Sequence, residues 1–186
     1  MSSVGGEPSS YNLAGMDQER PQTSSRLSHG EEAYPRVEVT VEIPRWSFLK
    51  RGSSGQVDFV SPLPCPYNYG AIGTMMGLDG DLLDAVILGP RLPRGTRIST
   101  TAFDAIGLTD RDMYDDKLIC SRQPLSPAER TAVLGFFRRY ASAKRLLNAL
   151  RGQRGATVCE GWTGANAALG RARPIDDGWK GPLVGF

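Results

Sequence analysis

Apolar and polar residues alternate without interruption from residue 37 to residue 43, in the run Val-Glu-Val-Thr-Val-Glu-Ile. A period of two predicts a β-strand with one buried face, and Glu42 would point away from that face. Turns that carry Gly or Pro separate further runs of this kind. They predict strands over 56–60, 84–89, 96–108, 117–122 and 155–160. The pattern favours a mostly antiparallel β arrangement.

A long helix is predicted to begin after Ser126. The run Ser126-Pro127-Ala128-Glu129 has the sequence of a capping box with Pro in the first turn, and apolar residues at helical spacing continue to about residue 150. This apolar stripe is expected to contact the core, and its members are Val133, Leu134, Phe137, Leu146, Leu147 and Leu150. Basic residues surround the same helix, and a solvated face is favoured over an anion or RNA surface. A second, short helix is predicted over 164–172.

The chain is expected to form one domain with a tail at each end. Residues 1–35 are rich in Ser, Gly, Pro, Gln and Glu and have no period of 2 or 3.6, which is typical of a disordered tail. A domain over 36–175 follows, with a C-terminal extension over 176–186. His29 is the one histidine and lies in the tail, which excludes Ser-His-Asp, Cys-His and histidine–zinc chemistry.

The net charge, the cysteines and the apolar runs of the sequence make several classes of protein unfavourable. The net charge of +2 is too mild to favour a nucleic-acid partner, and the interleaved aromatic and basic residues of single-strand binders are missing. The three cysteines form no C-x-x-C pair, which suits the reducing cytoplasm. The sequence has no apolar run of about 20 residues, so no membrane span is expected.

Three carboxylates crowd into the D-G-D-L-L-D segment at 79–84, shortly after the aromatic turn Y-N-Y-G at 67–70. Such crowding is unfavourable unless a cation binds, and Mg²⁺ takes carboxylate and phosphate oxygens. An EF-hand is excluded because its loop needs Gly at the sixth position, where this chain has Asp84. An isolated D-G-D can also be a solvated turn that caps a hairpin. The neighbouring motifs therefore decide between these interpretations.

Six motifs follow one another along the chain: E-I-P at 42–44, P-Y-N-Y-G at 66–70, D-G-D-L-L-D at 79–84, T-D-R-D-M-Y-D-D-K at 109–117, F-F-R-R-Y at 136–140 and E-G-W at 160–162. The fourth is expected to be a loop between two strands. The series resembles the soluble family I inorganic pyrophosphatases, over about residues 37–173. Their hallmark is D-G-D-P-L-D after Y-P-x-N-Y-G, with a further T-D-E-x-x-x-D-x-K loop. The resemblance implies a small closed antiparallel β-barrel, similar to an OB fold, flanked by two helices.

The resemblance also implies a set of site residues. Mg²⁺, with Mn²⁺ as an alternative, would be held by Asp79, Asp81, Asp84, Asp110 and Asp115, with Glu42 contributing through water. Asp81 would be the general base for the nucleophilic water. The phosphate under attack would be bound by Lys50, Tyr69 and Lys117, and Tyr140 on the long helix would bind phosphate as well.

Several family positions are changed in this chain. According to the resemblance, the family has an active-site Lys-x-Glu pair, an Arg, a Tyr, a Glu and a Lys at places where this chain has Gly52, an apolar or Pro-rich stretch around 60–63, Cys65, Arg111 and Ala141. Leu82 replaces the Pro of the signature. The family's Arg and its helix Lys grip the leaving phosphate. We therefore expect a preserved half around the attacked phosphate, a remodelled half around the leaving group, and weakened activity.

Three functions stay open at this level. The first is Mg²⁺-dependent hydrolysis of a phosphoanhydride, with inorganic pyrophosphate as the small phosphate-containing substrate. The second is a repurposed relative that acts on an organic diphosphate or does other metal-assisted chemistry. The third is a catalytically silent, partner-binding homologue. A homo-oligomer is expected, since the resemblance implies a hexamer for bacterial members, although Gly135 and Arg139 lie where those members have contact histidines.

Overall fold

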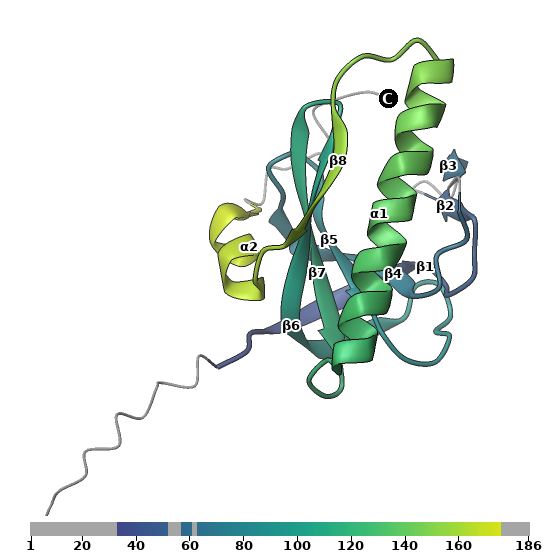
Figure 1. Ribbon diagram of the computed structural model, residues 1–186. Helices are drawn as coiled ribbons and strands as arrows, with labels where there is room; N and C mark the ends of the chain where they lie inside the picture. The colour runs from purple at the N-terminus through teal and green to yellow at the C-terminus, as the bar shows by residue number, and fades with distance from the viewer. Residues whose placement is uncertain (1–32, 52–56, 61–62, 176–186) are drawn as a thin grey trace, which may run out of the picture. The chain divides into compact units, whose positions relative to one another are not determined.

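The computed structural model describes residues 33–51, 57–60 and 63–175 (Figure 1). The side chains of 49–51 and 57–60 lie outside the description. The predicted tail, except for 33–35, and the predicted extension over 176–186 also lie outside it. The described part of the chain has two helices, neither of which is long and apolar enough to cross a membrane.

Most strands belong to one sheet of seven, in the order β1-β4-β5-β7-β6-β8, with β9 paired to β4. Because β1 pairs with β6 as well as with β4, the strands β1, β4, β5, β7 and β6 form a hydrogen-bonded ring. The pairing of β5 with β7 is parallel and the other pairings are antiparallel. The bounds are β1 Arg36–Ile43, β2 Leu49–Arg51, β3 Val57–Val60, β4 Asn68–Met76, β5 Leu82–Ile87, β6 Arg97–Asp110, β7 Met113–Ser121, β8 Thr157–Trp162 and β9 Arg173–Pro174.

The predicted strands are all present, although most differ by a few residues at their ends. The predicted alternation in β1 is confirmed, since the residues at 37, 39, 41 and 43 are buried and Glu42 is only half-buried. The segment at 67–70 was expected to be a turn, but Asn68 begins β4. This strand lies close to β1, because a Cβ on Gly70 would come within 2.1 Å of the carbonyl oxygen of Thr40.

The expected loop at 109–117 is a tight hairpin. Asp110 pairs with Met113, so the turn consists of Arg111 and Asp112. Both turn residues have positive φ angles, 52° and 65°, as a two-residue type I′ turn requires. Residues 113–117 therefore belong to β7, and their side chains alternate between the two faces of the sheet.

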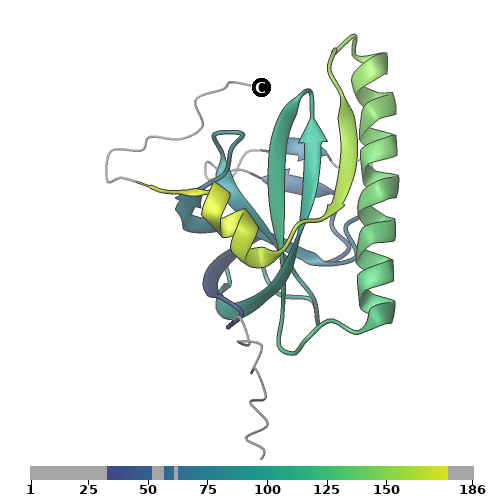
Figure 2. The same ribbon diagram turned by 60° about the vertical axis from the view of Figure 1, so that its left-hand side comes forward.

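The strands have a helix on either side (Figures 1 and 2). α2, Ala165–Arg171, adds Ala165 and Ala168 to a core cluster with members from all five ring strands. α1, Pro127–Leu150, packs Val133 and Phe137 against the other face of β5, β6 and β7. The capping box predicted at the start of α1 is confirmed, with Ser126 and Glu129 exchanging both of its hydrogen bonds.

The predicted apolar stripe of α1 is correct only in the first half of the helix. Leu146 and Leu150 were expected in the core, but they are 62% and 78% exposed. In the last two turns of the helix the buried side chain is instead the polar Asn148. A polar network therefore replaces apolar packing where α1 passes the end of the β6–β7 hairpin.

Candidate active site

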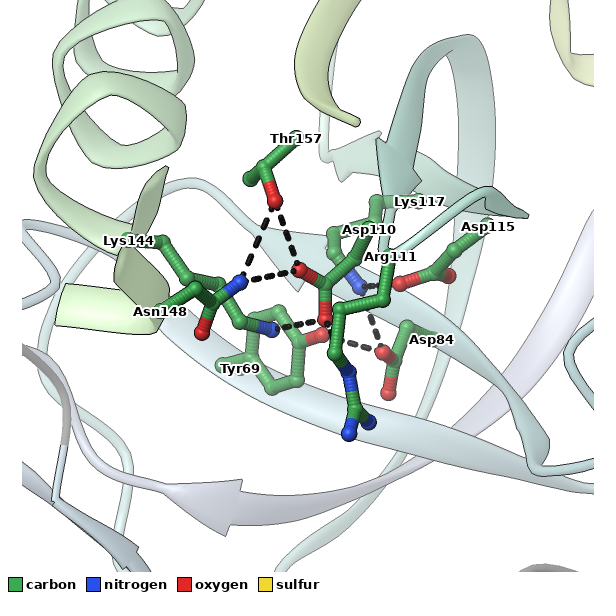
Figure 3. A network of polar contacts seen from close by, with 9 residues as sticks. All are labelled: Tyr69, Asp84, Asp110, Arg111, Asp115, Lys117, Lys144, Asn148 and Thr157. Atoms are coloured by element: carbon green, nitrogen blue, oxygen red, sulfur yellow. Dashed lines mark hydrogen bonds and ion pairs between the residues drawn. The ribbon is translucent and has the colours of Figure 1, made fainter. Parts of the chain in front are cut away.

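A buried lysine lies at the centre of the candidate site. Lys117 on β7 is directly opposite Asp84 on β5, and its Nζ lies 2.6 Å from an oxygen of Asp84 and 2.6 Å from an oxygen of Asp115 (Figure 3). Asp115 and Lys117 reach the same point because they are two residues apart on one strand. The hydroxyl of Tyr69 on β4 donates a hydrogen bond to Asp84 from the other side. Three strands thus bring four predicted site residues together.

The carboxylates of this cluster stabilise a positive charge, as the pKa values of its members show. Burial raises the pKa of Asp115 to about 7, and although Lys117 opposes this rise, the charges of Asp84 and Asp79 add to it. Burial disfavours a charged Lys117, yet Asp115 and Asp84 raise its pKa well above its ordinary value. Burial and Asp84 also raise the pKa of Tyr69, which keeps its proton. The cluster therefore holds more carboxylate charge than one ammonium neutralises.

A second polar group surrounds Asp110 at the end of β6. One carboxylate oxygen lies 2.8 Å from Nζ of Lys144, and the other accepts hydrogen bonds of 3.1 Å from Asn148 and Thr157. Burial acts to raise the pKa of Asp110, but these partners, led by Lys144, lower it below its ordinary value. Asp110 is therefore held as a carboxylate by partners from α1 and β8, as Figure 3 shows.

Lys144 is a site residue that the sequence analysis missed. The resemblance directed attention to position 141, where the family has a lysine, but Ala141 is buried and lines a groove beside β8 instead. Tyr140, Lys144 and Asn148 are spaced four residues apart, so they share one face of α1. This spacing in the sequence could have identified Lys144 as a neighbour of Tyr140. Nζ of Lys144 lies 6.0 Å from the centre of the Tyr140 ring, which places both beside Asp110.

Arg111 also lies beside this group. Its Nε is 3.8 Å from Asp110, and its backbone occupies the hairpin turn. The family has Glu at this position according to the resemblance, so a carboxylate is replaced by a cation. Together with Lys144, Arg111 gives this side of the site more positive charge than the family resemblance led us to expect.

The signature turn supplies the remaining carboxylates. Asp79 accepts a hydrogen bond of 3.2 Å from the backbone N–H of Asp81, and the turn is closed by a 2.8 Å bond from the N–H of Gly77 to the carbonyl of Asp81. Both aspartates are half-buried. Because its charge acts on the pKa of Asp115, Asp79 belongs to the same electrostatic environment as the Lys117 cluster.

Three further residues belong to the predicted site. Glu42 is half-buried on β1. Burial raises the pKa of Tyr140, and the charges of Lys117, Asp115, Asp110 and Asp84 act on the same hydroxyl. Lys50 lies in β2 opposite Phe59, and its side chain is outside the described part of the structure.

The carboxylate oxygens of this site are ligands of the type that a hard divalent ion prefers. Asp84 and Asp115 point oxygens at one position. Burial is the main cause of the raised pKa of Asp115, and the charge of Asp84 adds to it, so a dication would relieve the repulsion between the two carboxylates. In this conformation that position is taken by the ammonium of Lys117. Accordingly, no three Asp, Glu, Cys or His side chains of the described ranges converge closely enough to share an ion. Carboxylates are suitable ligands for Mg²⁺. The ammonium of Lys117 would have to move away before Asp84 and Asp115 could bind one ion together.

Comparisons with known proteins bear on this arrangement. The family model "Inorganic pyrophosphatase" matches residues 39–148, which is more than half of the chain and contains both carboxylate groups. The chain belongs to the inorganic pyrophosphatase family. Its likeness extends to the fold: the crystal structure of the inorganic pyrophosphatase from Thermus thermophilus superposes with a TM-score of 0.61 at 25% identity, covering 76% of this chain and 90% of that one.

Two curated relatives are similar in sequence. The inorganic pyrophosphatase of Saccharolobus solfataricus is 30% identical over 102 residues, and that of Gluconobacter oxydans is 28% identical over 138 residues. These alignments cover 50% and 62% of this chain. The chain spans only 59% of the length of the first relative and 80% of the second.

Proposed function

We propose that this inorganic pyrophosphatase family member hydrolyses a phosphoanhydride, inorganic pyrophosphate, with the help of Mg²⁺. The observation that carries the proposal is the pairing of two unlike groups in one site. One is the buried Lys117 between Asp84 and Asp115, and the other is the Asp110 group with Lys144 and Arg111 beside it. A substrate with two linked phosphates needs carboxylates for its metal ions and cations for its oxygens, and this site offers both.

The metal ions would be held by Asp79, Asp81, Asp84, Asp110 and Asp115, with Glu42 acting through water and with Mn²⁺ able to replace Mg²⁺. When bound, divalent ions lower the pKa of water and neutralise charge on phosphate oxygens. Asp81 takes the proton of the attacking water. Lys50, Tyr69 and Lys117 orient the attacked phosphate. The raised pKa of Tyr69 supports its part, because a protonated phenol can donate to a phosphate oxygen.

Lys144 and Arg111 hold the leaving phosphate in this proposal, beside Tyr140. They compensate for the Lys that the family carries where this chain has Ala141. The compensation is incomplete, since Asp110 already engages Lys144 at 2.8 Å and competes with the substrate for its ammonium. We therefore propose weakened hydrolysis, with poor substrate affinity as its main cause.

A phosphate-release assay with Mg²⁺ tests the function directly. We expect release from pyrophosphate, and little from nucleotides or prenyl diphosphates, because the described site contains binding groups for phosphate oxygens only. Preferential release from an organic diphosphate would favour a repurposed relative. No release from any substrate, with either Mg²⁺ or Mn²⁺, would favour a catalytically silent, partner-binding protein.

The role of Asp81 is tested by Asp81→Asn. Loss of a general base should lower kcat by roughly two to four orders of magnitude while the circular dichroism spectrum and the melting temperature stay those of a folded protein. The pH–rate profile should also lose its acidic limb. A folded variant with full turnover would show that another group takes the proton.

Membership of the family also suggests a closed barrel and an oligomeric state. We propose that the five-stranded ring closes as a barrel similar to an OB fold, which its unbroken pairing supports. We also propose a cytoplasmic homo-oligomer, in line with the hexamer that the family resemblance implies for bacterial members. Light scattering coupled to size exclusion measures the mass in solution, and a monomer at all concentrations would contradict the oligomer.

A further inference from the structure

We propose that a groove between α1 and β8 is a second oxyanion site, which binds a phosphate group outside the candidate active site. The groove has a volume of about 170 Å³. One wall is the face of α1 that carries Arg138, Ser142 and Arg145, and the other is β8 at Val158 and Cys159. This volume holds several waters, since one water occupies about 30 Å³ in the liquid, so a phosphate group can enter.

Two arginines give the groove its charge. Arg138 and Arg145 are seven residues apart, which places them on the same face of α1 about 10 Å apart along the axis. Both are exposed, and neither guanidinium forms an ion pair with any residue in the described part of the chain. No Asp or Glu belongs to the described lining of the groove. The two cations are therefore available to a ligand rather than committed to the fold.

The rest of the lining suits a phosphate group. The hydroxyl of Ser142 lies between the arginines in sequence and donates its one proton to the carbonyl oxygen of Arg138, so Ser142 adds a small polar side chain to the lining and the arginines supply the donors. Ala141, 5% exposed, adds a small side chain to the lining, which leaves room for a ligand between the arginines. Guanidinium groups bind phosphate oxygens with charge-assisted, often bidentate, hydrogen bonds, which makes this pair selective for oxyanions over other solutes.

The groove is distinct from the candidate site, yet it touches it. Thr157 contributes to the lining of the groove, and its hydroxyl also holds Asp110. The helical spacing places Arg138 and Arg145 on a different side of α1 from Tyr140 and Lys144. Free phosphate, which is the product of the proposed reaction, and the phosphate of a nucleotide share the chemistry that this groove recognises.

Cys159 offers a local measurement of binding. It is half-buried in the lining, whereas Cys65 and Cys120 are buried, so an alkylating reagent should reach Cys159 first. The full chain in EDTA is treated with iodoacetamide at constant ionic strength, with and without inorganic phosphate, and in a second series with AMP. Mass spectrometry of the peptide gives the alkylation rate of Cys159. We expect phosphate to slow alkylation in a saturable way, and AMP to do so if a phosphate ester fits as well.

Variants separate groove binding from other effects. Arg138→Gln combined with Arg145→Gln should raise the apparent dissociation constant of phosphate by ~10-fold or more, because two charge-assisted contacts are lost. Arg139→Gln combined with Arg151→Gln removes the same charge from α1 and its C-cap, outside the groove, and should keep the protection. Lys144→Met should keep it too, since Lys144 is not part of the described lining of the groove.

Three outcomes would overturn the proposal. The first is alkylation of Cys159 that neither phosphate nor AMP slows. The second is an equal loss of protection in both arginine pairs, which would indicate general charge attraction. The third is loss of protection in Lys144→Met alone, which would place the bound phosphate in the active site. Because the measurement needs neither Mg²⁺ nor turnover, its result is independent of the proposed hydrolase function.

Discussion

At the scale of single residues, the proposed function gives Lys144 the role that the family resemblance assigns to a lysine at position 141. The side chain at 141 faces β8 and cannot reach the candidate site, whereas the one at 144 is one turn beyond Tyr140 and reaches Asp110. A cation on the same face of a helix can serve the same ligand from a neighbouring turn, because the side chain is long and flexible.

Lys144→Met is therefore expected to raise the KM for pyrophosphate at saturating Mg²⁺ by ~10- to 100-fold, with a smaller effect on kcat. The size follows from one charge-assisted hydrogen bond to phosphate, about 1.5 to 3 kcal/mol. Steady-state kinetics give the two constants separately. Arg139→Met, at an exposed position on the same helix, is the matched control. An unchanged KM in Lys144→Met would mean that this lysine only pairs with Asp110.

Asp115 predicts a pH dependence of stability in the metal-free protein. Its pKa is about 7 in the folded state against an ordinary value of 3.8, so the folded state keeps a proton that the unfolded chain releases. The contribution of Asp115 to the free energy of unfolding is then present below about pH 4 and is lost as the pH rises towards 7. Asp115→Asn should remove this loss.

Melting temperatures in EDTA across this pH range measure the effect. The variant should gain on the wild type progressively as the pH rises from 4 to 7. Glu38→Gln changes the same charge at an exposed position of β1 and should run parallel to the wild type. A difference between Asp115→Asn and the wild type that does not vary with pH would contradict the prediction.

At the scale of elements, the sequence predicts most of the framework because its signals are local. Strict alternation located β1, and the capping box located the start of α1. β4 was missed because Tyr-Asn-Tyr-Gly resembles a turn, and only tertiary contacts reveal the strand. Buried Asn68 accepts backbone hydrogen bonds from Arg45 and Leu92 and donates to Pro90, so it fixes two loops rather than a turn of its own.

The second half of α1 was predicted wrongly for a related reason. Leucines at helical spacing predict a buried stripe, but the buried face here turns to Asn148, which serves the Asp110 group. Leu150→Ala should therefore change the free energy of unfolding by no more than about 0.5 kcal/mol, because the side chain is 78% exposed.

Phe137→Ala provides the contrast on the same helix. The Phe137 side chain is 2% exposed, and its removal should cost about 3 to 5 kcal/mol through lost burial and a cavity. Urea denaturation measures both variants. A large loss of stability in Leu150→Ala, dependent on protein concentration, would show that this leucine is buried between subunits rather than exposed.

At the scale of the whole molecule, the candidate site depends on the pairing of the ring strands. Tyr69, Asp84, Asp110 and Lys117 come from β4, β5, β6 and β7, and strand pairing brings them together across up to 48 residues of sequence. The motif order predicted these members because each lies in a recognisable segment. Asn148 and Thr157 could not be predicted in this way, since amide and hydroxyl partners of a carboxylate leave no motif and depend on how α1 and β8 pack.

The last prediction joins the fold to the metal. Mg²⁺ should raise the melting temperature of the protein, because an ion that binds the folded state alone stabilises it by mass action, by about 2.7 kcal/mol at 100 times the dissociation constant. The shift should grow from pH 5 to pH 8, since Asp115 must lose its proton before it can act as a ligand and its pKa is about 7. Asp84→Asn should remove most of the shift, because it takes a carboxylate from the position that Asp84 and Asp115 share. Glu38→Gln should keep the full shift. If Mg²⁺ leaves the melting curve of the wild type unchanged at every pH, Lys117 is the permanent cation of this site and the protein does not use a metal there.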